Sequence, residues 1–112
     1  MTSFDDREKG FEGKFAHDAE IEFKAIARRN RLLGLWAGGL MGLEGQHLED
    51  YAAAVVRSEF TERGDADVLR KVAKDLAGSG LKTTEDQVRG KMDEFLAVAR
   101  GQIQDGLKPS GE

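Results

Sequence analysis

Hydrophobic residues recur every three or four positions along most of this chain, a spacing that gives an α-helix one apolar face. The clearest run spans residues 16–41, and shorter runs span residues 46–60, 66–77 and 85–104. No stretch alternates hydrophobic and polar positions with the period of two that is typical of a strand. The pattern predicts an all-α fold, and short connectors between the last three helices favour an up-and-down four-helix bundle.

The first helix has the longest apolar stripe. At about 100° per residue, its members are Phe15, Ala19, Phe23, Ile26, Asn30, Leu33, Ala37 and Leu40. The later helices are predicted to bury Tyr51, Ala52 and Val55, then Val68, Val72 and Leu76, then Val88, Met92 and Ala99.

The opening stretch "FDDREKGFEGKFAHD" keeps the phase of that stripe, because Phe4 and Phe11 extend it backwards from Phe15. Gly10 and Gly13 interrupt the stretch, and each glycine costs a helix about 1 kcal/mol relative to alanine. We therefore expect a mobile, conditionally helical N-terminal segment, residues 1–18, followed by the bundle, residues 19–104, and a frayed tail, residues 105–112.

Several residues predict where helices end or approach each other. Asp65 is a candidate N-cap, Thr84 and Gln87 have the spacing of a capping box, and Gly78 is a candidate C-terminal glycine. The spacing of Gly34, Gly38 and Gly42 permits close approach of a backbone, from a neighbouring helix more readily than from a ligand.

Composition narrows the functional classes. The chain has 112 residues, no cysteine and a formal net charge of −4, so disulfides and thiolate chemistry are excluded and binding to nucleic acid is not expected. The longest apolar run, residues 32–43, is shorter than the roughly 20 residues that cross a bilayer. We expect a cytoplasmic protein without direct membrane insertion.

Catalytic and metal-binding patterns are weak. Glu44 and His47 form one Glu-x-x-His, whereas a di-iron bundle needs two such pairs and further carboxylates. No arrangement of a nucleophile with a base stands out, and the glycine-rich stretch at residues 38–45 lacks the lysine of a phosphate-binding loop. We expect neither an enzyme nor a required cofactor.

The stretch "KAIARRNR", residues 24–31, allows two interpretations. Lys24, Arg28 and Arg31 share a face opposite the apolar stripe, and Glu20 four residues before Lys24 indicates an ordinary solvated salt-bridge face. Arg29 lies two turns, about 10.5 Å, from Trp36, so the pair could hold a nucleotide by stacking and ion pairing. Alternatively Trp36 fills the core, and Asn30 is either a satisfied buried amide or a contact for the same ligand.

The pieces "FDDRE", "KFAHDAE", "ARRNRLLGLWA" and "GDADVLRK" resemble the zeta subunit of alphaproteobacterial F-type ATP synthases, a small regulator that inhibits ATP hydrolysis. The resemblance implies a four-helix bundle that binds ADP or ATP weakly as a regulatory ligand. It further implies an inhibitory stretch at residues 2–19 that becomes helical in the catalytic head, the partner of this peripheral protein. The residues carried over for binding the head are Phe4, Asp5, Asp6, Arg7, Glu8, Lys9, Phe11, Glu12, Lys14 and Phe15. The nucleotide-binding candidates are Arg28, Arg29, Asn30 and Trp36.

This chain departs from the pattern at Gly10 and Gly13, where a good helix former is usual in the family. The two glycines together cost about 2 kcal/mol, roughly 30-fold in affinity, so inhibition is expected to be weak. The alternative is a nucleotide-sensing helical module whose tail is functionally inert. A small bundle enzyme is a third possibility, for which the sequence shows no constellation of residues.

Overall fold

A computed structural model describes residues 3–59 and 65–107 of the chain, with side chains from residue 19 to 59 and from 65 to 104. It contains four α-helices: α1 (Ser3–Leu40), α2 (Gly45–Ser58), α3 (Ala66–Gly78) and α4 (Glu85–Leu107). No strand occurs in these described ranges. The predicted four-helix, all-α fold is confirmed.

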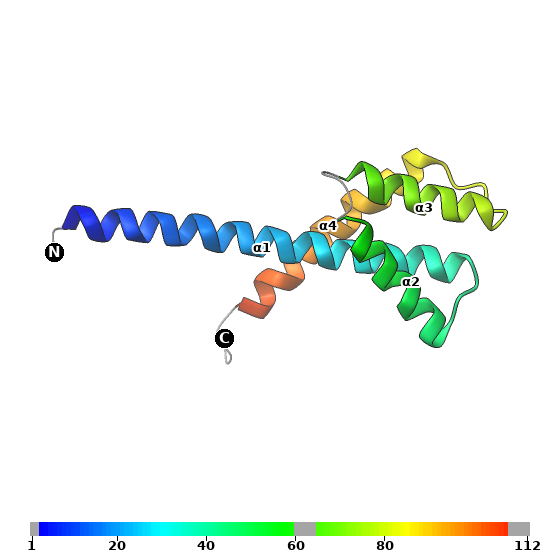
Figure 1. Cartoon of the computed structure of the whole chain (residues 1–112), viewed down its shortest axis with the longest axis horizontal. Coiled ribbons are helices and arrows are strands. Elements are labelled where there is room, and N and C mark those ends of the chain that lie inside the picture. Colours follow the sequence, from blue (N-terminus) through cyan, green and yellow to red (C-terminus); the bar gives the residue numbers. More distant parts are fainter. Residues whose placement is uncertain (1–2, 60–64, 108–112) are drawn as a thin grey trace.

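Helix α1 organises the molecule. The chain runs back and forth through successive helices, and α2 and α4 both pack on the C-terminal half of α1 (Figure 1). The N-terminal part of α1 projects away from the other three helices, which gives the molecule its 64 Å length. The backbone of residues 3–18 thus continues α1 without a break, whereas its mobility in the free protein stays a prediction.

The core lies where the four helices meet. Leu33 and Ala37 of α1 are fully buried, and the predicted inward residues of the later helices surround them. The other members of this core are Val55, Val68, Val72, Ala73, Leu76, Val88 and Met92.

Three described members of the predicted stripe of α1 are exposed: Ala19, Phe23 at 58% and Leu40 at 47%. Phe23 lies on the same face as the buried Asn30, but seven residues or about 10.5 Å nearer the N-terminus. Asn30 bonds to Glu59, the residue that follows α2, whereas Phe23 only borders a concave surface that it shares with Val56 near the end of that helix. Leu40 is the last residue of α1. Periodicity identified the face, but neighbouring helices cover only its middle.

Left-handed glycines end α1 and α3. Gly42 has φ 84° and Gly80 has φ 83°, and each follows its helix in a Schellman arrangement. In α1 the N–H of Leu43 donates to the carbonyl of Gly38 at 2.9 Å, and in α3 the N–H of Leu81 donates to that of Leu76 at 3.1 Å. Gly42 therefore serves a turn rather than packing, and Gly78 ends α3 while Gly80 makes the turn.

The two predicted N-terminal signals differ in outcome. The capping box of α4 is confirmed, because the N–H of Gln87 donates to Thr84 Oγ1 at 3.2 Å and that of Thr84 donates to Gln87 Oε1 at 2.9 Å. Asp65 occupies the N-cap position of α3 but makes no capping hydrogen bond. Its carboxylate instead accepts a bond from Arg29.

Gly34 and Gly38 provide the close contact between α1 and α2. A Cβ at Gly34 would lie 2.7 Å from the Cα of Ala52, and one at Gly38 would lie 2.6 Å from Leu48 Cδ1. The close-helix interpretation of these two glycines is confirmed.

Candidate functional site

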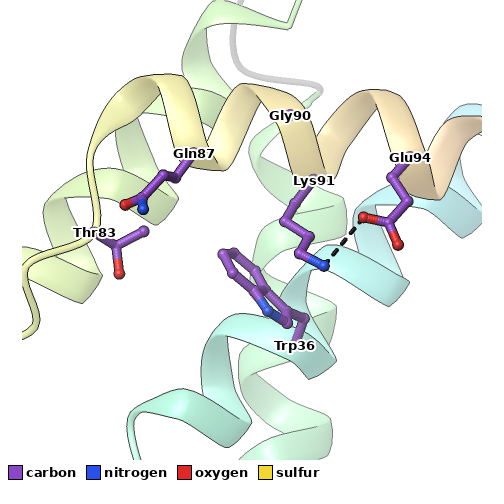
Figure 2. Close-up of a pocket in the computed structure, with 6 residues that line it drawn as sticks. All are labelled: Trp36, Thr83, Gln87, Gly90, Lys91 and Glu94. Atoms are coloured by element: carbon purple, nitrogen blue, oxygen red, sulfur yellow. Dashed lines mark hydrogen bonds and ion pairs between the residues drawn. The ribbon is translucent and has the colours of Figure 1, made fainter.

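A cavity of about 460 Å³ opens between α1 and the N-terminal half of α4. The indole of Trp36 forms one wall, and the facing residues come from α4 and the turn before it (Figure 2). They are Thr83, Gln87, Gly90, Lys91 and Glu94. Their spacing of three or four residues places them along one flank of α4.

Trp36 is partly buried and packs on the core without filling it. Its ring meets Phe95 edge to face, with centroids 6.4 Å apart. The Lys91 Nζ lies 5.9 Å from the indole centroid and 3.1 Å from a carboxylate oxygen of Glu94 (Figure 2). The cavity thus offers an aromatic face, a cation beside it, and nearby amide and hydroxyl groups.

These groups suit a planar ring attached to an anion, since the indole can stack and the ammonium can pair. Lys91 must give up or share its ion pair with Glu94 to do so, and that carboxylate repels an anionic group. Such a site is compatible only with weak anion binding.

Arg29 lies in a different environment, inside the bundle. Only 2% of the residue is exposed, and its guanidinium donates to Asp65 Oδ1 at 3.0 Å and to Glu59 Oε2 at 3.5 Å. Its Nε also donates to Asn30 Oδ1 at 3.0 Å. Asn30 is fully buried and donates to Glu59 at 3.4 Å. These residues satisfy one another, as buried polar groups require.

Glu59 has an unusual electrostatic position in this network. Burial raises the pKa of its carboxyl above the ordinary value, and the neighbouring Arg29 guanidinium opposes that rise without cancelling it. Arg89 of α4 also approaches the network, with 3.7 Å between its guanidinium and Asp65 Oδ2. The network therefore ties α1 and α4 to both ends of the α2–α3 connection.

The four nucleotide-binding candidates are divided among three places. Arg29 and Asn30 are buried and bonded within the bundle, and neither lines the cavity beside Trp36. Arg28 is exposed on another face of α1, where it donates to Gln102 at 3.5 Å. Only Trp36 belongs to the cavity. Contact of the other three with nucleotide stays a prediction.

Sequence reasoning missed the α4 side of the cavity, Lys91 above all. The sequence does contain a pattern that marks this side of the cavity. Polar residues recur at helical spacing beside the buried Val88 and Met92, namely Thr83, Gln87, Lys91 and Glu94. A single sequence could not show that this flank faces Trp36.

The remaining candidates add little chemistry. Among the described residues no three histidine, aspartate or glutamate side chains are grouped as metal ligands. Glu44 lies in extended backbone before α2, and His47 is exposed. No helix within the described ranges has the length and hydrophobicity to cross a membrane. The side chains predicted to bind the catalytic head, from Phe4 to Phe15, lie outside those that the structure describes.

Comparison with known proteins decides the family. The sequence profile of "ATPase inhibitor subunit zeta" matches residues 1–102. The chain belongs to the zeta family. A search of curated proteins found no significant match. Among solved structures, a solution NMR structure is 45% identical, with a TM-score of 0.68 over 78% of this chain and 99% of that one. The family match confirms the resemblance to a zeta subunit and identifies the chain as an ATPase inhibitor subunit.

Proposed function

We propose that this zeta-family chain inhibits ATP hydrolysis by inserting its N-terminal segment, as a helix, into the catalytic head of F-type ATP synthase. The observation that carries the proposal is the continuity of α1, whose first 16 residues extend beyond the bundle in the helical register of the rest (Figure 1). A helix of 16 residues is about 24 Å long. That length suits insertion between two subunits while the bundle stays outside.

Such an inhibitor needs no chemistry of its own. A rotary ATPase must open and close its catalytic interfaces, so a helix lodged in one of them stops the cycle. Phe4, Phe11 and Phe15 supply the apolar anchors at helical spacing, and the charged residues between them set the register. The bound protein is then peripheral to the membrane-bound synthase, on its cytoplasmic side.

The decisive experiment is titration of the full-length protein into its purified cognate ATPase while hydrolysis is followed. Deletion of residues 1–18 should abolish inhibition and leave the circular dichroism of the bundle intact. Deletion of residues 105–112 is the matched control and should leave inhibition unchanged. Inhibition that survives loss of residues 1–18 would refute the proposed mechanism.

We also propose that the cavity beside Trp36 binds ADP or ATP weakly as a regulatory ligand. The supporting observation is the pairing of the partly buried Trp36 indole with Lys91 in a cavity of about 460 Å³. The base would stack on Trp36, and Lys91 would meet the phosphates. Part of the cavity lies at the N-terminus of α4, where the helix dipole favours an anion.

Nucleotide binding is tested by NMR titration with ADP. The Trp36 indole and the Lys91 amide should shift, and Lys91→Met should weaken binding while Lys82→Met, an exposed lysine outside the cavity, should not. Shifts confined to other residues would refute this placement. Nucleotide binding by a full-length protein that never inhibits would favour the sensing module with an inert tail.

A further inference from the structure

A second concave surface lies at the junction of α1, α2 and α4, outside the Trp36 cavity. Its floor is apolar and consists of Phe23, Ala27, Val56 and Ile103. Its remaining lining is Lys24, Arg28 and Arg31, and its volume is about 380 Å³. We call these seven residues the Phe23 groove.

One residue of the floor, Phe23, is unusually exposed for a large hydrophobic side chain, whereas Ala27, Val56 and Ile103 are half-buried. Phe23 is 58% exposed, and among the described residues only Leu40 and Val98 are other large hydrophobic side chains with comparable exposure. Neither of those two lines the Phe23 groove or the Trp36 cavity. An aromatic ring in a shallow groove between helices is a typical anchor point for a partner helix.

The rim of the groove is entirely cationic. Arg28 is bonded only to the neutral amide of Gln102 among the contacts described for it, at 3.5 Å. Lys24 pairs with Glu20 at 3.1 Å and Arg31 pairs with Glu49 at 2.8 Å, but all four side chains are about half exposed. Exposed pairs of this kind contribute little and exchange readily. In a chain with net charge −4, the groove is therefore a local site for acidic side chains.

The groove is also fixed in position relative to the N-terminal segment. Phe23 lies on α1 five residues beyond residue 18, about 7.5 Å along one unbroken helix. Any partner that encloses the N-terminal segment as a helix must therefore come within reach of the groove.

We infer that the Phe23 groove docks an acidic amphipathic helix of the ATPase head, at the mouth of the interface that the N-terminal segment enters. One apolar side chain of that helix contacts Phe23 and Val56, and its carboxylates pair with Arg28 and its neighbours. This inference rests on the proposed function. It adds a second contact, which sets affinity while the N-terminal segment sets inhibition.

The test uses the full-length protein and the purified cognate ATPase, with binding measured by calorimetry and hydrolysis measured in parallel. Arg28→Glu is paired with Lys82→Glu, and Phe23→Ala is paired with Val98→Ala, because all four side chains are exposed and the control residues lie outside the groove. Each groove variant should weaken binding about tenfold, and each control less than about twofold. All four should still inhibit completely at saturation. The wild-type affinity should fall with added salt more steeply than that of Arg28→Glu.

The outcomes separate the two proposals. If the wild type inhibits and the groove variants bind as their controls do, the groove is not a docking site. If the wild type binds without inhibiting and the groove variants bind more weakly, the groove is upheld and the proposed inhibition is wrong. Self-association of the wild type that Arg28→Glu abolishes would show a second copy as the occupant and overturn the inference.

Discussion

The contact between α1 and α2 at Gly34 supports a stability prediction with an unambiguous sign. A Cβ built on Gly34 would lie 2.7 Å from the Cα of Ala52 and 3.3 Å from the Cβ atoms of Ala52 and Val55. The atom that opposes it most closely belongs to the backbone and has no rotamer by which to move away. Gly34→Ala therefore forces the two helices apart by about 1 Å to restore ordinary van der Waals distances of about 3.5–4.0 Å.

Two effects oppose each other in this variant. Replacing a helical glycine by alanine stabilises the helix by about 0.8–1.0 kcal/mol. Overpacking of a close contact costs about 1–3 kcal/mol, and the upper half of that range applies because backbone has to move. The net loss is about 1–2 kcal/mol, which lowers the melting temperature by about 4–8 °C per kcal/mol in a domain of this size.

Gly101→Ala is the matched control. Gly101 lies within α4, is exposed, and would bring its Cβ within 4 Å of nothing beyond its own helical backbone. This variant should gain about 0.8–1.0 kcal/mol. The measurement is urea unfolding followed by circular dichroism. The wild type and the two variants should show nearly the same slope of unfolding free energy against urea concentration. If Gly34→Ala gains stability by the same increment as Gly101→Ala, the close helix contact does not limit packing as argued.

Three further predictions concern function, helix capping and pH. Gly10→Ala/Gly13→Ala should lower the half-inhibitory concentration in the ATPase titration by roughly 30-fold, because about 2 kcal/mol of helix cost is removed; an unchanged value would show that helix formation is not limiting. Thr84→Ala should lower the free energy of unfolding by about 1 kcal/mol through loss of the cap, while its neighbour Thr83→Ala should change it by less than about 0.5 kcal/mol; equal losses would remove the role of the cap. Because burial raises the pKa of Glu59 above its ordinary 4.5, the folded state binds that proton more tightly than the unfolded chain. The stability of the wild type relative to Glu59→Gln should be greatest below pH 4.5 and fall as pH rises through the raised pKa; urea unfolding at several pH values checks this, and a constant difference would contradict it.

Much of the fold follows from local rules that a single sequence displays. The helices from α2 to α4 begin and end within three residues of the predicted bounds, because apolar periodicity and the Thr84–Gln87 capping box depend only on neighbouring residues. Gly34 and Gly38 were recognisable as close-contact positions for the same reason.

The candidate site was less predictable because it depends on which helices face each other. Phe23 shares its face with Asn30, yet Phe23 is exposed and Asn30 is buried, and the difference depends on how the other helices pack on α1. Trp36 was identifiable as a ligand candidate, but its neighbours Gln87 and Lys91 lie more than fifty residues away in sequence. Local pattern cannot specify such pairings.

Residues of the stretch "ARRNRLLGLWA" lie in different environments. Arg29 is buried and ion-paired inside the bundle, whereas other residues of the stretch line surface pockets. The sequence makes Arg29 a nucleotide-binding candidate together with Trp36, and in the structure its guanidinium pairs with Glu59 and Asp65, at the two ends of the α2–α3 connection. Removing one partner from a buried cation is strongly destabilising, so the pairing with these carboxylates gives Arg29 a role in the stability of the bundle. The neighbouring Arg28 and Arg31 point to the groove, and Trp36 to the cavity. One helix therefore contributes to two proposed binding surfaces, on either side of a polar contact that holds it in the bundle. Since the N-terminal segment continues that same helix, the contact that fixes α1 also fixes the direction in which the segment leaves the bundle.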